Sequence, residues 1–177
     1  MSLVSICIPT FNQTKYLRKV LDSVFEQTFT DYEVIVSDDS ITSEVKELID
    51  EYIAKGNEIR YFHHEPALGS PENWNFAMRQ AQGEYIKIMH HDDWFYKNDS
   101  LEIQVNTILH NHNSFVYSYA KSIVYGKEST FYSKKNLLHL VIKDPLMLMI
   151  THNLFGPPSG LLFKKNDCLH FDKKLIW

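Results

Sequence analysis

Residues 4–40 read VSICIPTFNQTKYLRKVLDSVFEQTFTDYEVIVSDDS, and this stretch decides the fold. Residues 3–8 form an almost unbroken apolar run with β-branched side chains, which is typical of a strand buried on both faces. Residues 33–37 are a second short strand. Between them, residues 15–27 carry an apolar stripe at helical spacing, formed by Leu17, Val20, Leu21, Val24 and Phe25. A strand, a helix and a second strand in this order predict a βαβ unit.

The alternation of strands and helices continues to residue 109. Strands are predicted over residues 59–64 and 84–89, and helices over residues 43–54, 71–82 and 100–109. In the first of these helices we expect Val45, Leu48, Ile49 and Ile53 to face inward and Gly56 to end the helix. Repeated units of this kind predict an α/β fold, in which helices cover both faces of a parallel sheet.

The pattern weakens after residue 114. Short strands are predicted over residues 114–120, 122–126, 130–134 and 159–165, and a helix over residues 144–151. No internal repeat, low-complexity tract or linker marks a second domain. We therefore expect residues 1–177 to form a single domain, because a chain of this length can bury one substantial core.

The composition argues against several classes of protein. A net charge of −4 lacks the basic excess of a duplex nucleic-acid binder. Cys7 and Cys168 are the only cysteines and are far apart, so neither a disulfide framework nor a cysteine-rich zinc site is expected. The N-terminal residues lack the features of a signal peptide, and no apolar run approaches the ~20 residues of a membrane helix. These features predict a cytoplasmic protein without a membrane span.

Polar residues follow three of the predicted strands. The loops read PTFNQT at residues 9–14, DDS at residues 38–40 and HHDDW at residues 90–94. In parallel sheets, ligands bind beyond the carboxyl ends of the strands, near the switch in strand order. The first loop has neither the glycine-rich dinucleotide fingerprint nor a P-loop, which argues against a redox enzyme or an ATPase. The sequence therefore predicts a ligand site of another kind at this edge.

Two of these loops contain adjacent carboxylates. Asp92 and Asp93 are costly to hold together unless a cation lies beside them, and a divalent ion that also binds a diphosphate is one answer. A solvated turn in which an aspartate caps a helix is the alternative. Asp38 and Asp39 have the same two interpretations: one carboxylate accepts a hydrogen bond from a nucleobase, or both shape a turn.

Neighbouring histidines occur at His63–His64 and at His90–His91. Adjacent residues at a strand end point to opposite faces, so neither pair is expected to chelate one ion. His110 and His112 lie two residues apart near a helix end and diverge as well. The histidine spacing therefore does not predict a zinc site.

Read together, these segments resemble the family 2 glycosyltransferases with the GT-A fold. The similarity begins with residues 4–40 and continues through NWNFAMRQAQGEYIKIMHHDDW at residues 73–94. It resumes with FGPPSGLLFKK at residues 155–165 and FDKKLIW at residues 171–177, so that it spans essentially the whole chain. The resemblance implies a Rossmann-like three-layer α/β/α sandwich with a mainly parallel sheet.

The resemblance also assigns site residues by position. The nucleotide is expected to contact Pro9, Thr10, Phe11, Asn12, Asp38, Asp39, Asn75 and Asp92. The first four would line the base and ribose, and Asp38 would bind the base, a pyrimidine such as uracil. Asp92 and Asp93 would bind the ribose and a diphosphate-bound metal ion, Mn²⁺ or Mg²⁺. The family's usual first acid of this motif is His90 here, a departure that bears on ribose contact and metal affinity.

Two further segments correspond to the sugar and acceptor region of the family. Residues 156–160, GPPSG, resemble the stretch that borders the donor sugar, with a tight proline-rich turn as the alternative. The family's general base, which deprotonates the acceptor hydroxyl, would follow just beyond Trp177, and Asp172 looks structural. We therefore expect the chain to be truncated before its catalytic base and to transfer sugar feebly or not at all on its own.

The function implied by the resemblance is transfer of a sugar from a nucleotide-diphospho-sugar, a UDP-sugar, with inversion. The acceptor would be a hydroxyl of a glycan, a lipid-linked molecule or another glycoconjugate, in polysaccharide or glycoconjugate synthesis. The expected location is cytoplasmic, with peripheral attachment at the inner face of the membrane as a variant. A non-catalytic nucleotide-sugar-binding module and a nucleotidyltransferase are the alternatives.

Overall fold

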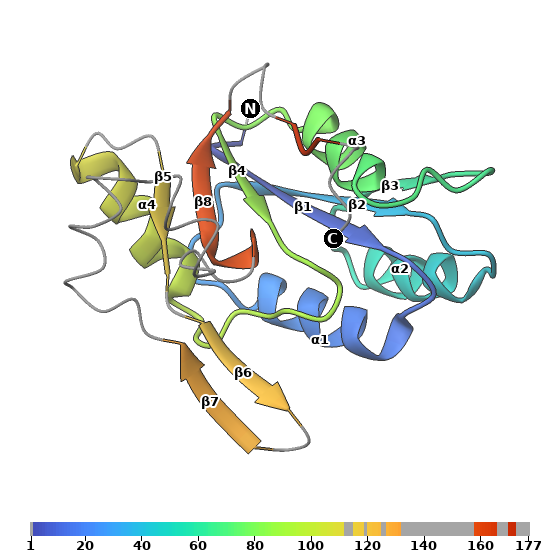
Figure 1. The fold of residues 1–177 in the computed structure, drawn as a ribbon, viewed down its shortest axis with the longest axis horizontal. Helices are drawn as coiled ribbons and strands as arrows, with labels where there is room; N and C mark the ends of the chain where they lie inside the picture. Colours follow the sequence, from blue (N-terminus) through green and yellow to red (C-terminus); the bar gives the residue numbers. More distant parts are fainter. Residues whose placement is uncertain are drawn as a thin grey trace.

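A six-stranded sheet forms the centre of the molecule (Figure 1). The computed structural model describes residues 2–111, 115–118, 120–124, 127–131, 158–165 and 170–172. The strands of this sheet are β1 (Val4–Thr10), β2 (Tyr32–Asp38), β3 (Arg60–His63), β4 (Tyr85–Ile88), β5 (Phe115–Tyr117) and β8 (Leu161–Lys164). Their order across the sheet is β3-β2-β1-β4-β8-β5.

The first four strands are parallel, as the sequence predicts. β1 pairs in parallel with β2 on one side and with β4 on the other, and β2 pairs in parallel with β3. β8 is antiparallel to both β4 and β5. In the register of β1 and β2, Thr10 lies opposite Asp38, so the loops that follow these two strands begin side by side.

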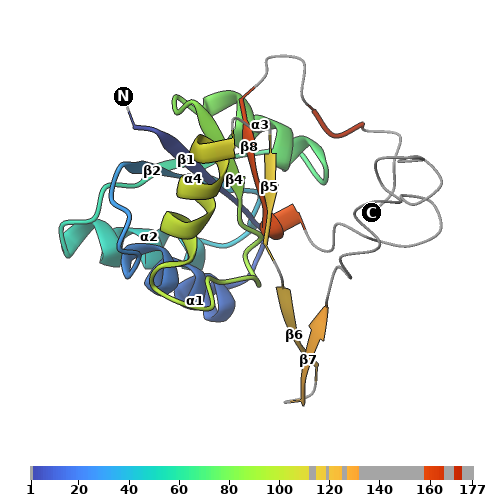
Figure 2. The same cartoon turned by 90° about the vertical axis from the view of Figure 1, so that its left-hand side faces the viewer.

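Helices cover both faces of the sheet and give three layers (Figures 1 and 2). The helices are α1 (Thr14–Phe25), α2 (Glu44–Ala54), α3 (Glu72–Gln80) and α4 (Ser100–Asn111). Alternate residues of β1 divide between two cores, since Val4, Ile6 and Ile8 pack with α1, α2 and α4. Cys7 packs instead with the buried side chains of α3. This arrangement confirms the predicted α/β/α sandwich.

The predicted helices agree with the structure, with one correction in α2. Its buried side chains are Val45, Leu48, Ile49 and Tyr52, whereas Ile53 is 45% exposed, so the prediction that Ile53 faces inward is wrong. Tyr52 takes the inward position because its ring stacks on Phe25 of α1 at 5.8 Å and its hydroxyl donates to Asp22. An apolar-only pattern overlooks a tyrosine that is buried with a partner for its hydroxyl.

Gly56 ends α2 as predicted. Its φ of 93° lies in the left-handed region, which glycine adopts without steric cost, and its N–H donates to the carbonyl oxygen of Ile53 at 2.9 Å.

The later part of the chain contains a separate hairpin. β6 (Ala120–Val124) and β7 (Lys127–Phe131) pair antiparallel and project away from the main sheet (Figure 2). With β5 and β8, they account for the four short strands predicted after residue 114. A 3-10 turn, η1 (Pro158–Gly160), leads into β8. The helix predicted over residues 144–151 lies outside the described residues. No helix in the described part of the chain is long and apolar enough to cross a membrane.

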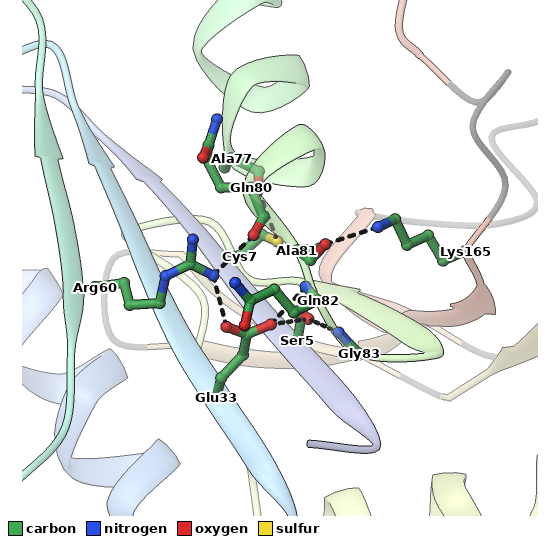
Figure 3. Close-up of polar contacts among 10 residues, drawn as sticks. All are labelled: Ser5, Cys7, Glu33, Arg60, Ala77, Gln80, Ala81, Gln82, Gly83 and Lys165. Carbon is green, nitrogen blue, oxygen red and sulfur yellow. Dashed lines mark hydrogen bonds and ion pairs between the residues drawn. The ribbon is translucent and has the colours of Figure 1, made fainter. Parts of the chain in front are cut away.

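Glu33 of β2 links neighbouring strands near their N-terminal ends (Figure 3). One carboxylate oxygen accepts hydrogen bonds from the Ser5 hydroxyl and the Gln82 backbone N–H, both at 2.6 Å, and the other accepts from Arg60 at 2.7 Å. Burial acts to raise the pKa of Glu33, but the hydrogen bonds from Ser5, Arg60 and Gln82 outweigh it and lower the pKa. One carboxylate therefore links β1, β2, β3 and the α3–β4 turn.

Gly83 belongs to the same cluster because its backbone packs directly on β1. Its N–H donates to the Ser5 hydroxyl at 2.8 Å, and a Cβ atom at this position would lie 2.8 Å from the backbone nitrogen of Ser5. The turn from α3 into β4 can approach β1 this closely only with glycine.

We predict that Glu33→Gln lowers the free energy of unfolding at pH 7 by about 1–3 kcal/mol. Since the folded-state pKa of Glu33 is below its unfolded-state value, the stabilisation is complete above the unfolded-state pKa and is lost as the pH falls through the folded-state pKa. In urea denaturation, the difference between wild type and variant should therefore shrink below about pH 4. Glu84→Gln is the control, because Glu84 is half exposed and its ion pair with Lys164 is a surface contact. Equal effects of the two substitutions would contradict the assignment.

Candidate functional site

The loops after β1 and β2 are held together by backbone and side-chain hydrogen bonds. The Asp39 N–H donates to the Thr10 carbonyl oxygen at 3.1 Å. The Asn12 N–H donates to the Ser40 hydroxyl at 2.7 Å, and the Asn12 side chain accepts from the Ile41 N–H at 3.0 Å. Asn12 has a φ of 48°, a conformation that asparagine tolerates better than most residues. The structure thus brings together two of the loops that the sequence singles out.

Asp38 is fully buried and both its carboxylate oxygens have partners within the protein. One accepts from the Ser40 N–H at 2.9 Å and the other from the Tyr61 hydroxyl at 2.6 Å. Burial, and then the hydrogen bond and charge of Asp38, raise the pKa of Tyr61, so the hydroxyl remains a donor. These contacts give Asp38 a role in shaping the loop, and its contact with a base stays a prediction.

Asp39 is also buried and holds the segment that leads into α3. Its two oxygens accept hydrogen bonds from the backbone N–H groups of Leu68 at 3.1 Å and Gly69 at 2.8 Å. Gly69 has a φ of 73°, in the left-handed region that glycine adopts without steric cost. The carboxylate therefore fixes the position of residues 68–69 relative to the loop after β2.

Two asparagines of α3 contribute in different ways. Asn73 donates to the Thr10 carbonyl oxygen at 3.2 Å and accepts from the Ser37 hydroxyl at 2.5 Å. Asn75 exchanges two hydrogen bonds with the backbone of Phe171, at 2.7 and 2.9 Å. Asn75 therefore anchors residues 170–172, and its contribution to nucleotide binding stays a prediction. Asn73 could not be selected from the sequence, because its hydrogen-bond partners lie far away along the chain.

The first loop offers both a buried and an exposed surface. Pro9 and Thr10 are buried within β1, and the Thr10 hydroxyl has no hydrogen-bond partner among the described residues. Phe11 is 49% exposed, which leaves its ring accessible for stacking. Large aromatic side chains that remain exposed beside polar loops are suited to bind a planar ring.

The loop after β4 forms a candidate metal centre. His90, Asp92 and Asp93 each present one ligand atom, and these atoms all lie within 4.8 Å of one another. The loop is a tight turn, since the Asp93 N–H donates to the His90 carbonyl oxygen at 3.1 Å. The set of two carboxylates and one imidazole fits a divalent cation. His91 is not part of the group, in agreement with the expected divergence of neighbouring histidines.

His90 is a functional candidate that sequence reasoning did not select. Its Nε2 atom is buried and has no hydrogen-bond partner among the described residues, while the Trp74 ring packs against it at 4.5 Å between centroids. Burial lowers the pKa of His90 more strongly than the nearby charges of Asp93 and Asp92 raise it. The imidazole is therefore neutral near pH 7 and retains a lone pair. The sequence feature that could have drawn attention to His90 is that it replaces the first acid of the family's motif.

Ser159 connects the metal loop to the turn before β8. Its hydroxyl donates to a carboxylate oxygen of Asp93 at 2.5 Å and accepts from the His90 N–H at 3.1 Å. Of the segment GPPSG, residues 156 and 157 lie outside the described part, whereas Ser159 and Gly160 are buried. The segment thus contacts the predicted metal residues directly, and its contact with a donor sugar stays a prediction.

Lys87 lies beneath the same loop and is 1% exposed. Its ammonium group donates to the Ser159 carbonyl oxygen at 2.5 Å and lies 5.4 Å from the centre of the Phe95 ring. Burial lowers the pKa of Lys87 to about 7, against the opposing effect of the Asp93 carboxylate. In the sequence, Lys87 stands out only as a lysine within an otherwise apolar strand. Its contact with Ser159 is apparent only from the structure.

The beginning of α3 joins the two groups of residues. Asn73 contacts the loop after β1, and the next residue, Trp74, packs on His90. The strands β1 and β4 are neighbours, so their following loops emerge at the same edge of the sheet. The predicted nucleotide loops and the predicted metal loop therefore border one site.

Comparison with known proteins assigns the chain to a family. The family model described as Glycosyl transferase family 2 matches residues 5–169. An uncharacterized glycosyltransferase of Rickettsia typhi is 31% identical over 172 residues, which cover 92% of this chain and 52% of that protein. A GalNAc(5)-diNAcBac-PP-undecaprenol beta-1,3-glucosyltransferase of Campylobacter jejuni is 33% identical over 94 residues, covering 52% of this chain and 30% of that protein.

A solved structure has a similar fold. Residues 1–349 of S. aureus TarS in complex with UDP-GlcNAc superpose with a TM-score of 0.64 at 26% identity, covering 76% of this chain and 38% of that one. The chain therefore spans about half or less of the length of these three proteins.

We predict that Lys87→Met changes how stability depends on pH. Because burial holds the folded-state pKa of Lys87 near 7, below that of an unfolded lysine, the unfolded chain binds the extra proton above pH 7. The lysine's contribution therefore makes the wild type gain stability between about pH 7 and 10, by at most about 1.4 kcal/mol per pH unit. The variant should lack this gain in denaturant titrations. Lys164→Met, at an exposed position on β8, is the control and should follow the wild type. Parallel curves for wild type and Lys87→Met would refute the burial of a titrating amine.

Proposed function

The chain belongs to glycosyl transferase family 2, and from this premise we propose that it binds a UDP-sugar and takes part in transfer of the sugar, with inversion and release of UDP, to an acceptor hydroxyl. The similarity to TarS bound to UDP-GlcNAc supports a uridine nucleotide as the donor. The Campylobacter jejuni relative is named as a glucosyltransferase that acts on a lipid-linked glycan. It supports an acceptor of the glycan or lipid-linked class and a role in polysaccharide or glycoconjugate synthesis.

The observation that carries the proposal is the group formed by His90, Asp92 and Asp93 at the carboxyl end of β4. A divalent ion bound there would offset the charge that develops on the departing nucleoside diphosphate. Asp92 and Asp93 would hold this ion, and the Ser159 hydroxyl orients Asp93 by donating to its carboxylate. Two adjacent carboxylates, of which Asp93 is oriented by this hydrogen bond, are suited to bind a pyrophosphate through a cation.

The nucleoside is proposed to lie over the loops after β1 and β2. The exposed Phe11 ring offers a stacking surface for the base, and Asn12 lies at the entrance of the same loop. Asp38 and Asp39 act on the nucleotide mainly by fixing these loops, since their carboxylates are buried and hydrogen-bonded. The Thr10 hydroxyl, which has no hydrogen-bond partner in the described part of the chain, is a candidate for a contact with the nucleotide.

The acceptor side of the reaction needs a general base that deprotonates the attacking hydroxyl. Residues 173–177 lie outside the described part of the chain. We propose that residues 1–177 act as a donor-binding GT-A domain. A cytoplasmic location, with peripheral attachment at the inner face of the membrane, is likewise a proposal.

We predict that changing both Asp92→Asn and Asp93→Asn weakens metal-dependent binding of UDP by about tenfold or more. The reason is that neutral amides replace the two carboxylates that would hold the ion. Isothermal titration calorimetry of UDP with Mn²⁺ and, separately, with EDTA measures the effect. Asp50→Asn serves as the control, because Asp50 lies on the exposed face of α2 in an ion pair with Lys46. Unchanged UDP affinity in the double variant would remove the basis of the proposed function.

We also predict that Phe11→Ala weakens binding of UDP and of uridine monophosphate by similar factors, about 5- to 100-fold, because a base–aromatic stack contributes about 1–3 kcal/mol. Thermal stability should change little, since the ring is half exposed. Leu109→Ala, an exposed apolar side chain on α4, is the matched control. Calorimetry with the two nucleotides separates the base from the diphosphate. A loss confined to UDP would contradict stacking by Phe11.

A further inference from the structure

His90 places an imidazole in the metal loop, where the resemblance leads one to expect a carboxylate. We propose that a ring nitrogen of His90 is a direct ligand of the divalent ion, and that this nitrogen makes the site select a first-row transition ion such as Mn²⁺ over Mg²⁺. This inference rests on the proposed function, because it concerns the same ion. It adds the identity of the third ligand and the resulting metal preference.

The first support is the geometry of the three ligands. The atoms presented by His90, Asp92 and Asp93 all lie within 4.8 Å of one another. Ligands of an ion that binds at about 2.1 Å are about 3.0 Å apart when adjacent and about 4.2 Å apart when opposite, so side-chain adjustments of about an ångström bring all three into one coordination sphere. Asp92 is exposed and can make this adjustment freely.

The second support is that His90 has an unused polar atom in a buried position. Its Nε2 atom is shielded from solvent and finds no hydrogen-bond partner among the described residues. Buried polar atoms nearly always have a partner in folded proteins, so an exception calls for an explanation. Trp74 covers the ring at 4.5 Å between centroids, which restrains the imidazole, while Nε2 has no partner among the described residues. If this residue served only for packing, an apolar side chain would fill the position without the cost of burying an unpaired polar atom.

The third support is the way the protein fixes the backbone and the neighbouring carboxylate. The Ser159 hydroxyl accepts from the His90 N–H at 3.1 Å and donates to Asp93 at 2.5 Å. One side chain thus holds the loop at both ends of the ligand set. Preorganised ligands with hydrogen-bonded supports are characteristic of metal sites.

The metal preference follows from the donor atoms. Mg²⁺ is a hard ion that takes oxygen ligands and keeps much of its water, whereas imidazole suits transition ions. Two carboxylates alone would bind either ion. Replacing one oxygen donor with a nitrogen donor therefore shifts the preference toward Mn²⁺, and more strongly toward Co²⁺ and Zn²⁺, in the order of their intrinsic affinities.

The test uses the 177-residue chain with UDP and Mn²⁺ and reads the ligand directly. Electron spin-echo envelope modulation of bound Mn²⁺ should show a coupled ¹⁴N nucleus, which changes to the ¹⁵N pattern when the protein is labelled with ¹⁵N-histidine. This measurement needs no variant, so it is independent of any effect on folding. Competition between Mn²⁺ and Mg²⁺, followed by the free Mn²⁺ signal, gives the ratio of affinities.

The decisive variant is His90→Asp, which returns an acid to this position. It should lose the nitrogen signal, retain binding of UDP with Mg²⁺, and reduce the ratio of Mn²⁺ to Mg²⁺ affinity by about tenfold or more. His91→Asp is the matched control, because it makes the same chemical change at the adjacent residue, outside the ligand group. It should keep both the signal and the ratio.

The outcomes separate the inference from the proposed function. If UDP binds with a metal ion, but Mn²⁺ shows no nitrogen coupling and His90→Asp leaves the affinity ratio unchanged, the histidine ligand is refuted and the proposed function stands. If neither UDP nor a metal ion binds to the wild-type chain, both are refuted. Loss of the nitrogen signal in His91→Asp instead of His90→Asp would also overturn the assignment to His90.

Discussion

The parallel pairing of β1 on both of its sides is the constraint on which the site depends. Because β2 and β4 run in the same direction as β1, the loops after all three strands leave the sheet at one edge. The register fixes their relative height, with Thr10 opposite Asp38 and the Met89 N–H bonded to the Cys7 carbonyl oxygen at 2.9 Å. The start of α3 then closes the arrangement, since Asn73 and Trp74 contact one loop each. Residues that are remote in sequence become neighbours by sheet register.

The charge of the loop after β4 is only partly balanced within the protein. Beneath the loop after β4, the buried Lys87 faces the Ser159 carbonyl oxygen and the Phe95 ring, with the Asp93 carboxylate acting on it from the loop. A buried amine whose pKa is lowered toward 7 supplies only part of a positive charge at neutral pH. It therefore cannot compensate both Asp92 and Asp93, and the remaining negative charge leaves room for a cation. The proposed ion binding would thus be coupled to stability through one small group of side chains.

The sequence was sufficient for the elements of the fold but not for the contacts between them. The strands and helices up to residue 111, the end of α2 at Gly56 and the parallel order follow from periodicity and turn chemistry, which act over a few residues. Ile53 was misplaced because Tyr52 is buried through its hydroxyl partner, Asp22, which lies on another helix. The contact of Ser159 with Asp93 and the position of Lys87 escaped notice for the same reason, since their hydrogen bonds join segments more than sixty residues apart. Local patterns carry no information about such pairs.

The two aspartate pairs illustrate why composition alone cannot assign a role. Asp38 and Asp39 are buried, and their four carboxylate oxygens accept hydrogen bonds from Ser40, Tyr61, Leu68 and Gly69. Each of these oxygens already holds part of the protein in place and keeps only one further lone-pair site for a ligand. At the second pair, Asp93 has a bond from Ser159, whereas Asp92 is exposed and no described residue is hydrogen-bonded to its carboxylate. Oxygens without a protein partner can take up an ion at little cost. The same two letters therefore build a scaffold after β2 and the proposed ligand set after β4, and the difference lies in which carboxylate oxygens have hydrogen-bond partners among the described residues.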